Sequence, residues 1–236
     1  MGHVPPPQHF DPESEEPLDA YVVLAAAAAK WGLVAGRIER ATRDRLAELL
    51  DLVRAGGRDP DIRFDAARQA AGLLRERVPE EFGEDAGARL VATPAADGRV
   101  TVQGFAPEDL AILLIDGHRM VGPVLGPVRE RLLAQPALDA EELRRCGGDP
   151  FAPDLIRLRG TGGQVRLPRF QFSEDTLPWP VVLEVNGLLA ADRDPWGAAD
   201  WWLSANAWLG TSPARLLGTG RDRQLADTAR FLMEDE

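Results

Sequence analysis

Cysteine, histidine and lysine are all scarce in this chain of 236 residues. Its single cysteine, Cys146, excludes a disulfide within the chain. Two of the three histidines lie within the first ten residues, which leaves His118 for a folded site. One cysteine and one histidine do not supply the nitrogen and sulfur ligands that a zinc site needs. We therefore expect neither a metal site nor a cofactor.

Long apolar runs are also lacking. The longest, Tyr21–Ala29, is far shorter than the roughly 20 residues that cross a bilayer. The N-terminus is acidic and rich in proline, which is not typical of a secretory signal. We expect a cytoplasmic protein that does not contact membranes.

The net charge of −11 is concentrated at the two ends of the sequence. Residues 1–20 carry −5 and residues 231–236 carry −3, so the body is nearly neutral. An acidic chain disfavours broad binding to nucleic acid, but a nearly neutral body weakens that argument. The hydrophobic content of 44% is enough for a core and excludes disorder throughout.

Apolar periodicity and turn residues predict a mainly α protein with two small β-hairpins. We expect a disordered leader at 1–18, a helical region at 19–136, a degenerate helix-turn-helix-like segment with a basic hairpin at 137–172, and a helical binding domain at 173–236. Hairpins are expected at 89–103 and 154–167, and helices at 20–55, 61–77, 107–115, 127–134, 139–146, 181–189, 194–206, 213–217 and 222–233.

Catalytic motifs are largely missing. The run Gly160–Gly163 lacks the Lys-Ser/Thr of a phosphate loop and favours a hairpin turn. Cys146 follows two arginines, but it has no histidine partner and is better explained as a structural cysteine. We do not expect an enzyme. Catalysis by His118 beside Asp116 and Arg119 is the last of three hypotheses.

A basic segment lies near the middle of the chain. If 154–167 forms a hairpin, Arg157 and Arg159 share one face, which would suit contacts with phosphates. The alternative is a solvated face that pairs with local acids, and we favour it. The six arginines of this segment are Arg144, Arg145, Arg157, Arg159, Arg166 and Arg169.

Five of the six tryptophans follow residue 178. On the helix expected at 194–206, Trp196, Ala199 and Leu203 line one face, and Trp201 points elsewhere. Two adjacent tryptophans do not both enter one core, so one of Trp201 and Trp202 faces a partner or the N-terminal region. A large two-sided core is the equal alternative.

The segment from Trp202 to Gly220 resembles the toxin-binding domain of Xre/MbcA/ParS antitoxins. It has that family's Trp-Leu pair, an Asn, a Leu-Gly turn, a Pro and a Leu-Leu before a Gly. The upstream run Leu167–Phe172 is similar to the Pro-x-Phe-Gln-Phe entry of many members. The residues expected to bind a partner are Trp201, Trp202, Asn206, Trp208, Leu209, Gly210, Pro213 and Leu217.

The resemblance implies an antitoxin-like protein that occludes a toxin, such as an NAD-degrading enzyme of the RES type. The acidic tail of the present chain, Glu234–Glu236, can reach an arginine-lined pocket of such a partner. The alternative is a DNA-binding regulator that uses residues 144–169, although Pro150 and Pro153 break the would-be recognition helix. We also expect a homodimer or larger oligomer, because the apolar run Tyr21–Ala29 needs covering.

Overall fold

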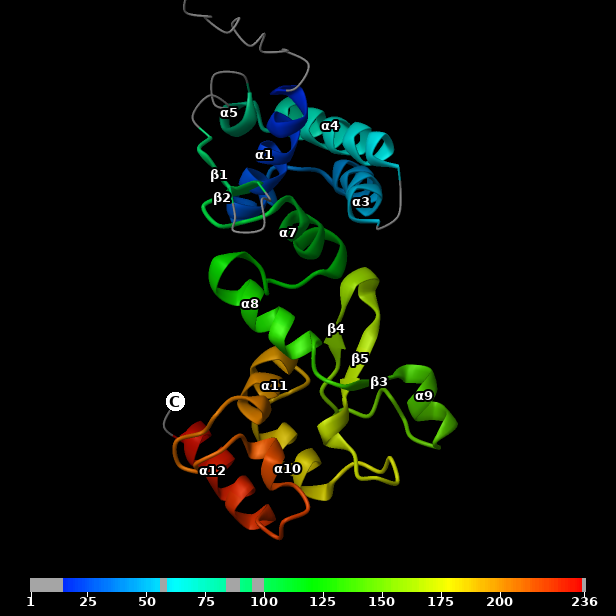
Figure 1. Cartoon of the computed structure of the whole chain (residues 1–236), viewed down its shortest axis with the longest axis vertical. Helices are drawn as coiled ribbons and strands as arrows, with labels where there is room; N and C mark the ends of the chain where they lie inside the picture. The colour runs from blue at the N-terminus through cyan, green and yellow to red at the C-terminus, as the bar shows by residue number, and fades with distance from the viewer. Residues whose placement is uncertain (1–14, 56–58, 84–89, 95–99, 235–236) are drawn as a thin grey trace, which may run out of the picture. The chain divides into compact units, whose positions relative to one another are not determined.

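The computed structural model describes residues 15–55, 59–83, 90–94 and 100–234 (Figure 1). The fold is mainly α with two small antiparallel sheets, as the sequence predicts. The chain divides into unit 1, Met1–Pro123, and unit 2, Val124–Glu236. The boundary predicted from the sequence lies later, after residue 136. None of the helices in the described ranges combines the length and the apolar character that crossing a bilayer requires.

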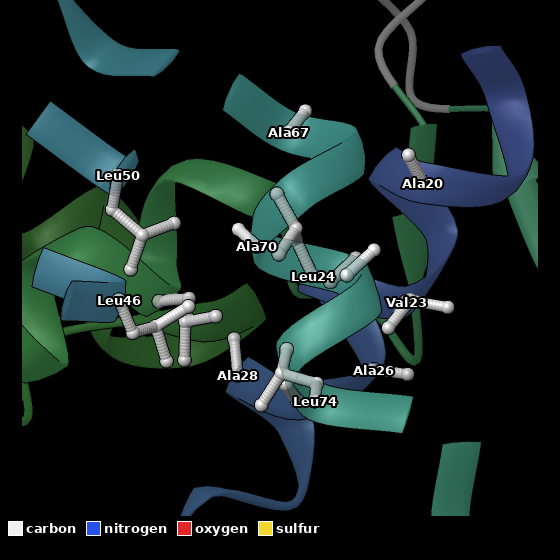
Figure 2. Packing of buried hydrophobic residues seen from close by; sticks show 14 of the residues in the cluster. Ala20, Val23, Leu24, Ala26, Ala28, Leu46, Leu50, Ala67, Ala70 and Leu74 are labelled. Atoms are coloured by element: carbon white, nitrogen blue, oxygen red, sulfur yellow. The ribbon is translucent and has the colours of Figure 1, made fainter. Parts of the chain in front are cut away.

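Unit 1 is built around a helix that is apolar on all sides. α1 (Glu15–Ala29) packs against α4 (Pro60–Arg77), α7 (Pro107–Ala111) and β2 (Val100–Val102). Small alanine side chains of α1 and α4 let the two helices approach closely, and leucines of α3 (Arg40–Arg54) and α4 fill the adjacent space (Figure 2). A helix that is hydrophobic all round is expected to be buried.

The burial of α1 corrects one expectation about oligomers. Every residue from 22 to 28 is buried, and α1 is covered by elements of its own unit. The run Tyr21–Ala29 therefore does not need a second copy of the chain to cover it. The helix also starts at Glu15, so the end of the expected disordered leader is helical. Residues 1–14 of that leader lie outside the described residues.

The single helix predicted at 20–55 is wrong, because the segment forms three helices. α1 ends at Ala29, α2 (Trp31–Val34) makes one turn, and α3 starts at Arg40. Lys30 separates α1 from α2 with φ −102° and ψ 18°. Its Nζ donates a hydrogen bond of 2.7 Å to Glu81 Oε2, and this bond lowers the pKa of the Glu81 carboxyl. Lys30 is thus tied to α5 (Pro79–Phe82).

A buried ion pair joins α3 to the segment that follows α7. There the chain forms a π-helical turn, Ile112–Asp116, which ends at Gly117 with φ 71°. Arg54 Nη1 donates to both carboxylate oxygens of Asp116, at 2.9 and 3.1 Å. The side chain of Asp116 is 2% exposed and that of Arg54 is 11% exposed. Two charges can be buried in this way only because each satisfies the other.

Both predicted hairpins are present. β1 (Ala92–Pro94) pairs antiparallel with β2, and residues 95–99 between them lie outside the described residues. In unit 2, β4 (Leu158–Arg159) pairs with β5 (Val165–Pro168). A third strand, β3 (Ala137–Asp139), was not predicted. It pairs with the other edge of β5 and gives the strand order β3-β5-β4.

Two helices of unit 2 start at residues whose side chains cap them. Asp139 and Glu142 form a reciprocal capping box at α9 (Ala140–Arg145), and the Asp194 side chain accepts from Gly197 N at 2.9 Å at the start of α11 (Pro195–Leu203). The remaining helical elements are α8 (Gly122–Leu133), which starts at the unit boundary, α10 (Pro180–Leu188), α12 (Asp222–Glu234), and 3₁₀ turns at Thr161–Gly163, Arg169–Gln171 and Pro213–Leu216.

Candidate interaction surface

A tight turn between α11 and the 3₁₀ turn sets the direction of one tryptophan. Asn206 Oδ1 accepts from the backbone N of Trp208 at 3.0 Å and of Leu209 at 3.2 Å. The Asn206 backbone pairs with Thr211, and Gly210 has φ 72°, a conformation that favours glycine. Leu209 is thereby directed into the core at 5% exposure, while Trp208 points outward at 60%. The helix expected at 194–206 therefore ends early, at Leu203, and Asn206 and Gly210 are residue types that suit this turn.

The outward Trp208 meets an aromatic residue of α12. The rings of Trp208 and Phe231 pack edge to face, with centroids 5.4 Å apart and planes at 89°. Phe231 is itself 50% exposed. Edge-to-face pairs are favourable arrangements of two aromatic rings, so the pair forms a fixed apolar surface rather than two independent side chains.

The aromatic pair borders a shallow groove of about 710 Å³, which we call the α12 groove. Four of its five α12 positions, Gln224, Asp227, Thr228 and Phe231, follow the i, i+3, i+4, i+7 spacing of one helix face. The inner face of α12 is a different stripe, formed by buried Leu225, Ala226 and Ala229. The remaining lining residues of the groove are Trp208, Gly220, Arg221 and Arg223.

Packing and ion pairs fix the helix that carries the groove. α12 packs against α10, and Arg230 Nη2 contacts Glu184 Oε1 of α10 at 3.2 Å. Arg230 also pairs with Asp227 at 3.0 Å, and Arg223 lies 3.6 Å from the same carboxylate. Such exposed pairs contribute little stability individually. Their effect on the groove is to neutralise Asp227, so that Arg221 supplies the unbalanced charge.

Comparison with protein-family models, with curated proteins and with solved structures finds no match. The geometry of the chain is therefore the basis on which each expected site residue is assessed.

Trp202 is wrongly predicted as a partner-binding residue. It is 0% exposed, and its Nε1 donates a hydrogen bond of 2.8 Å to Asn186 Oδ1. A side chain with no exposed surface cannot contact a partner on the folded unit. The stripe of α11 that enters the core consists of Trp196, Ala199 and Trp202, rather than ending at Leu203 as expected.

The bond to Trp202 belongs to a buried polar network. Asn186 Nδ2 donates to Asp154 O at 2.7 Å and to Gln171 Oε1 at 3.3 Å. Gln171 also accepts from Ile156 N at 2.7 Å and donates to Ile156 O at 3.0 Å. Both amide side chains are 0% exposed, so the network satisfies groups whose unpaired burial would be costly. It joins α10, α11 and the loop before β4.

The other expected partner-binding residues separate into two groups. Leu209 and Pro213 are buried and Leu217 is half-buried, so their main role is to pack the short helices against one another. Trp201 is half-buried and packs edge to face on Trp202, with ring centroids 5.1 Å apart. Trp208 is the prominently exposed member of the expected set. The residues that the structure adds beside it are Phe231 and the outer face of α12.

A sequence signal for this face exists. Leu225, Ala229 and Leu232 already complete an inward stripe at i, i+4, i+7, and Phe231 lies outside that stripe. A large aromatic residue that misses the inward stripe of an amphipathic helix indicates an exposed apolar position.

The arginines of the basic segment, residues 144–169, do not form one common surface in the structure. Arg157 precedes β4 and donates to Ala152 O at 2.6 Å, so it does not share a strand face with Arg159 as expected. Arg166 donates to Gln135 O at 3.3 Å, and Arg169 donates to Phe172 O at 2.8 Å. These three guanidinium groups therefore hold local backbone. The exposed members of the set are Arg144, Arg145 and Arg159.

The second helix of a helix-turn-helix is missing from the described part of the chain. α9 ends at Arg145, and residues 146–157 form turns and irregular structure. The two prolines, at 150 and 153, account for this, since each lacks a backbone N–H and restricts the preceding residue. Cys146, at the end of α9, is exposed.

Asp116, the acid expected beside His118, is bound to Arg54. His118 is half-buried, and its Nδ1 accepts from Met120 N at 3.3 Å. Within the described residues, no three His, Cys, Asp or Glu side chains gather in a group that would hold a metal ion.

Proposed function

We propose that this chain is a non-enzymatic, antitoxin-like interaction protein of the cytoplasm, which binds a protein partner through unit 2 and occludes it. The observation that carries the proposal is the fixed, exposed pair of Trp208 and Phe231 beside an apolar groove. Tryptophan is enriched among the residues that dominate binding energy at protein interfaces. Rigid aromatic side chains also lose little conformational entropy when they bind.

The resemblance of residues 202–220 to antitoxins supports a toxin as the partner, with an NAD-degrading enzyme of the RES type as the specific candidate. The turn that this resemblance covers is the one that directs Trp208 outward. Near the same surface, α12 ends at exposed Glu234. A carboxylate run there suits an arginine-lined active site, because charge-assisted hydrogen bonds to guanidinium are strong.

Removing the exposed aromatic residues is expected to abolish partner capture without unfolding unit 2. Trp208→Ala and Phe231→Ala variants of the tagged chain, expressed in the native host, should retain the partner about 30-fold less than the wild type, the loss typical of an interface hot spot. The matched control is Phe151→Ala, because Phe151 is an equally exposed aromatic residue at 59% on another part of unit 2. Quantitative mass spectrometry of the captured proteins provides the measurement.

The captured protein is then assayed for NAD consumption. Consumption that stops on adding the wild-type chain, but continues with Trp208→Ala, is the expected result. Equal capture by the wild type and both aromatic variants would show that this face does not bind the partner. Capture of a protein that leaves NAD intact would remove the RES-type candidate and keep the interaction.

A further inference from the structure

We propose that the α12 groove also takes α12 of a second copy of this chain, packed antiparallel about a two-fold axis. The inference rests on the proposed function, because both use the face formed by Trp208, Phe231 and the α12 groove. Self-association and partner binding would therefore exclude each other. The occupant follows from the spacing, charge and shape of the groove.

The spacing of the groove residues suits a helix as the occupant. Positions 221, 224, 228 and 231, which run from the residue before α12 to Phe231, alternate steps of three and four residues, the spacing of a coiled-coil seam. Facing helices dock along such a face with one anchor on each successive turn. The seam lies outside the stripe that α12 uses to pack on its own unit.

Charge complementarity selects α12 itself and its direction. In an antiparallel pair centred between Asp227 and Thr228, Arg221 of one copy lies opposite Glu234 of the other, at both ends of the interface. Arg221 Nε donates a hydrogen bond of 2.8 Å to Gln224 Oε1. Within the described residues, Arg221 forms no ion pair with a carboxylate, and Glu234 forms none with a cationic side chain. A parallel pair would instead place like charges together, which is unfavourable.

Shape complements the same register. Phe231 of one copy then lies opposite Gln224 of the other, four residues after Gly220 in the sequence. A Cβ built on Gly220 would have no heavy atom within 4 Å, so space is open there for an incoming ring. Because the two copies are related by a two-fold axis, the space at Gly220 is filled in the same way at both ends of the interface. Each copy contributes one Phe231 and its adjacent Trp208.

The test measures the mass of the purified full-length chain alone by sedimentation equilibrium. A single helix pair is smaller than a standard interface, so we expect dissociation constants on the order of 1–100 µM. Phe231→Glu and Arg221→Glu should each weaken the dimer by about tenfold or more, since one replaces the docking ring with a carboxylate and the other faces Glu234 with a like charge. Circular dichroism checks that each variant is folded.

Charge exchange tests the direction of the helices. Glu234→Arg alone should also weaken the dimer, and the double variant Arg221→Glu with Glu234→Arg should restore it to within about threefold. Arg215→Glu is the matched control, because Arg215 is an exposed arginine of the same unit outside the groove. It should leave the dimer unchanged.

Three results would overturn the inference: a monomer at about 100 µM, a dimer indifferent to Phe231→Glu, or a double charge exchange that fails to restore association. Each is read from the chain alone and is independent of partner capture. A monomer whose Trp208→Ala variant still loses the partner would leave the proposed function standing. A charge-sensitive dimer that captures no partner would contradict the proposed function alone.

Discussion

Replacing Trp202 with alanine is expected to destabilise unit 2 by about 3–5 kcal/mol, the range for truncating a fully buried large aromatic residue. The indole is 0% exposed and packs on both Phe170 and Trp201, with ring centroids 5.4 and 5.1 Å away. Its removal leaves a cavity and also deprives Asn186 Oδ1 of the Nε1 donor. A loss of this size is comparable with the whole stability of many domains, so unit 2 should lose its cooperative unfolding transition.

Two further variants separate packing from hydrogen bonding. Trp202→Phe keeps an aromatic ring but removes the donor, and the unpaired Asn186 oxygen should cost about 1–3 kcal/mol beyond the smaller packing loss. Trp208→Ala is the control, because Trp208 is 60% exposed and its loss should change stability by only about 0.5 kcal/mol. Urea unfolding followed by far-ultraviolet circular dichroism measures all three. Equal stability of Trp202→Ala and Trp208→Ala would contradict the buried position of Trp202.

Removing Asp116 is expected to destabilise unit 1 by about 3–5 kcal/mol, because Asp116→Ala leaves the Arg54 guanidinium buried without its counter-ion. The Arg54 side chain is 11% exposed, and its other acidic neighbour, Asp51, is 3.7 Å away at the surface. Asp51→Ala is therefore the matched control. It removes an exposed carboxylate from the same arginine and should cost less than about 1 kcal/mol.

A double variant decides whether the loss of stability in Asp116→Ala comes from the missing ion pair or from the unpaired, buried charge of Arg54. Arg54→Met combined with Asp116→Leu removes both charges and keeps apolar volume, so its stability should lie close to that of the wild type. A double variant as unstable as Asp116→Ala would show that the ion pair itself holds the π-helical turn against α3. Thermal unfolding of the wild type, Arg54→Met, Asp116→Leu and the double variant, analysed as a double-mutant cycle, gives the coupling free energy.

Features encoded by neighbouring residues were predictable from the sequence. Asp194 and Pro195 mark the start of α11, and Asn206 and Gly210 mark the turn that exposes Trp208. Each depends on bonds between residues a few positions apart, so local rules for caps and turns apply. The mainly α fold with two hairpins follows from the same kind of information.

Features that depend on distant contacts were not predictable in this way. β3 is recognisable only through its pairing with β5, almost thirty residues later. Trp201 and Trp202 are adjacent and chemically identical, and the burial of Trp202 is decided by Asn186 on another helix. The break between α1 and α3 has no proline to mark it, although the pattern does change there from an all-apolar helix to an amphipathic one.

Lys30 gives unit 1 a single bond that a lysine-specific endopeptidase can cut. Since the chain has no other lysine, a lysine-specific endopeptidase can cut it only between Lys30 and Trp31, giving fragments 1–30 and 31–236. In the folded unit that bond lies at the junction of α1 and α2, with the ammonium held by Glu81. Cleavage then requires local opening, and its rate reports the opening equilibrium of unit 1 alone. Glu81→Gln should speed the appearance of both fragments on a denaturing gel, whereas Trp202→Ala, in the lysine-free unit 2, should leave that rate unchanged.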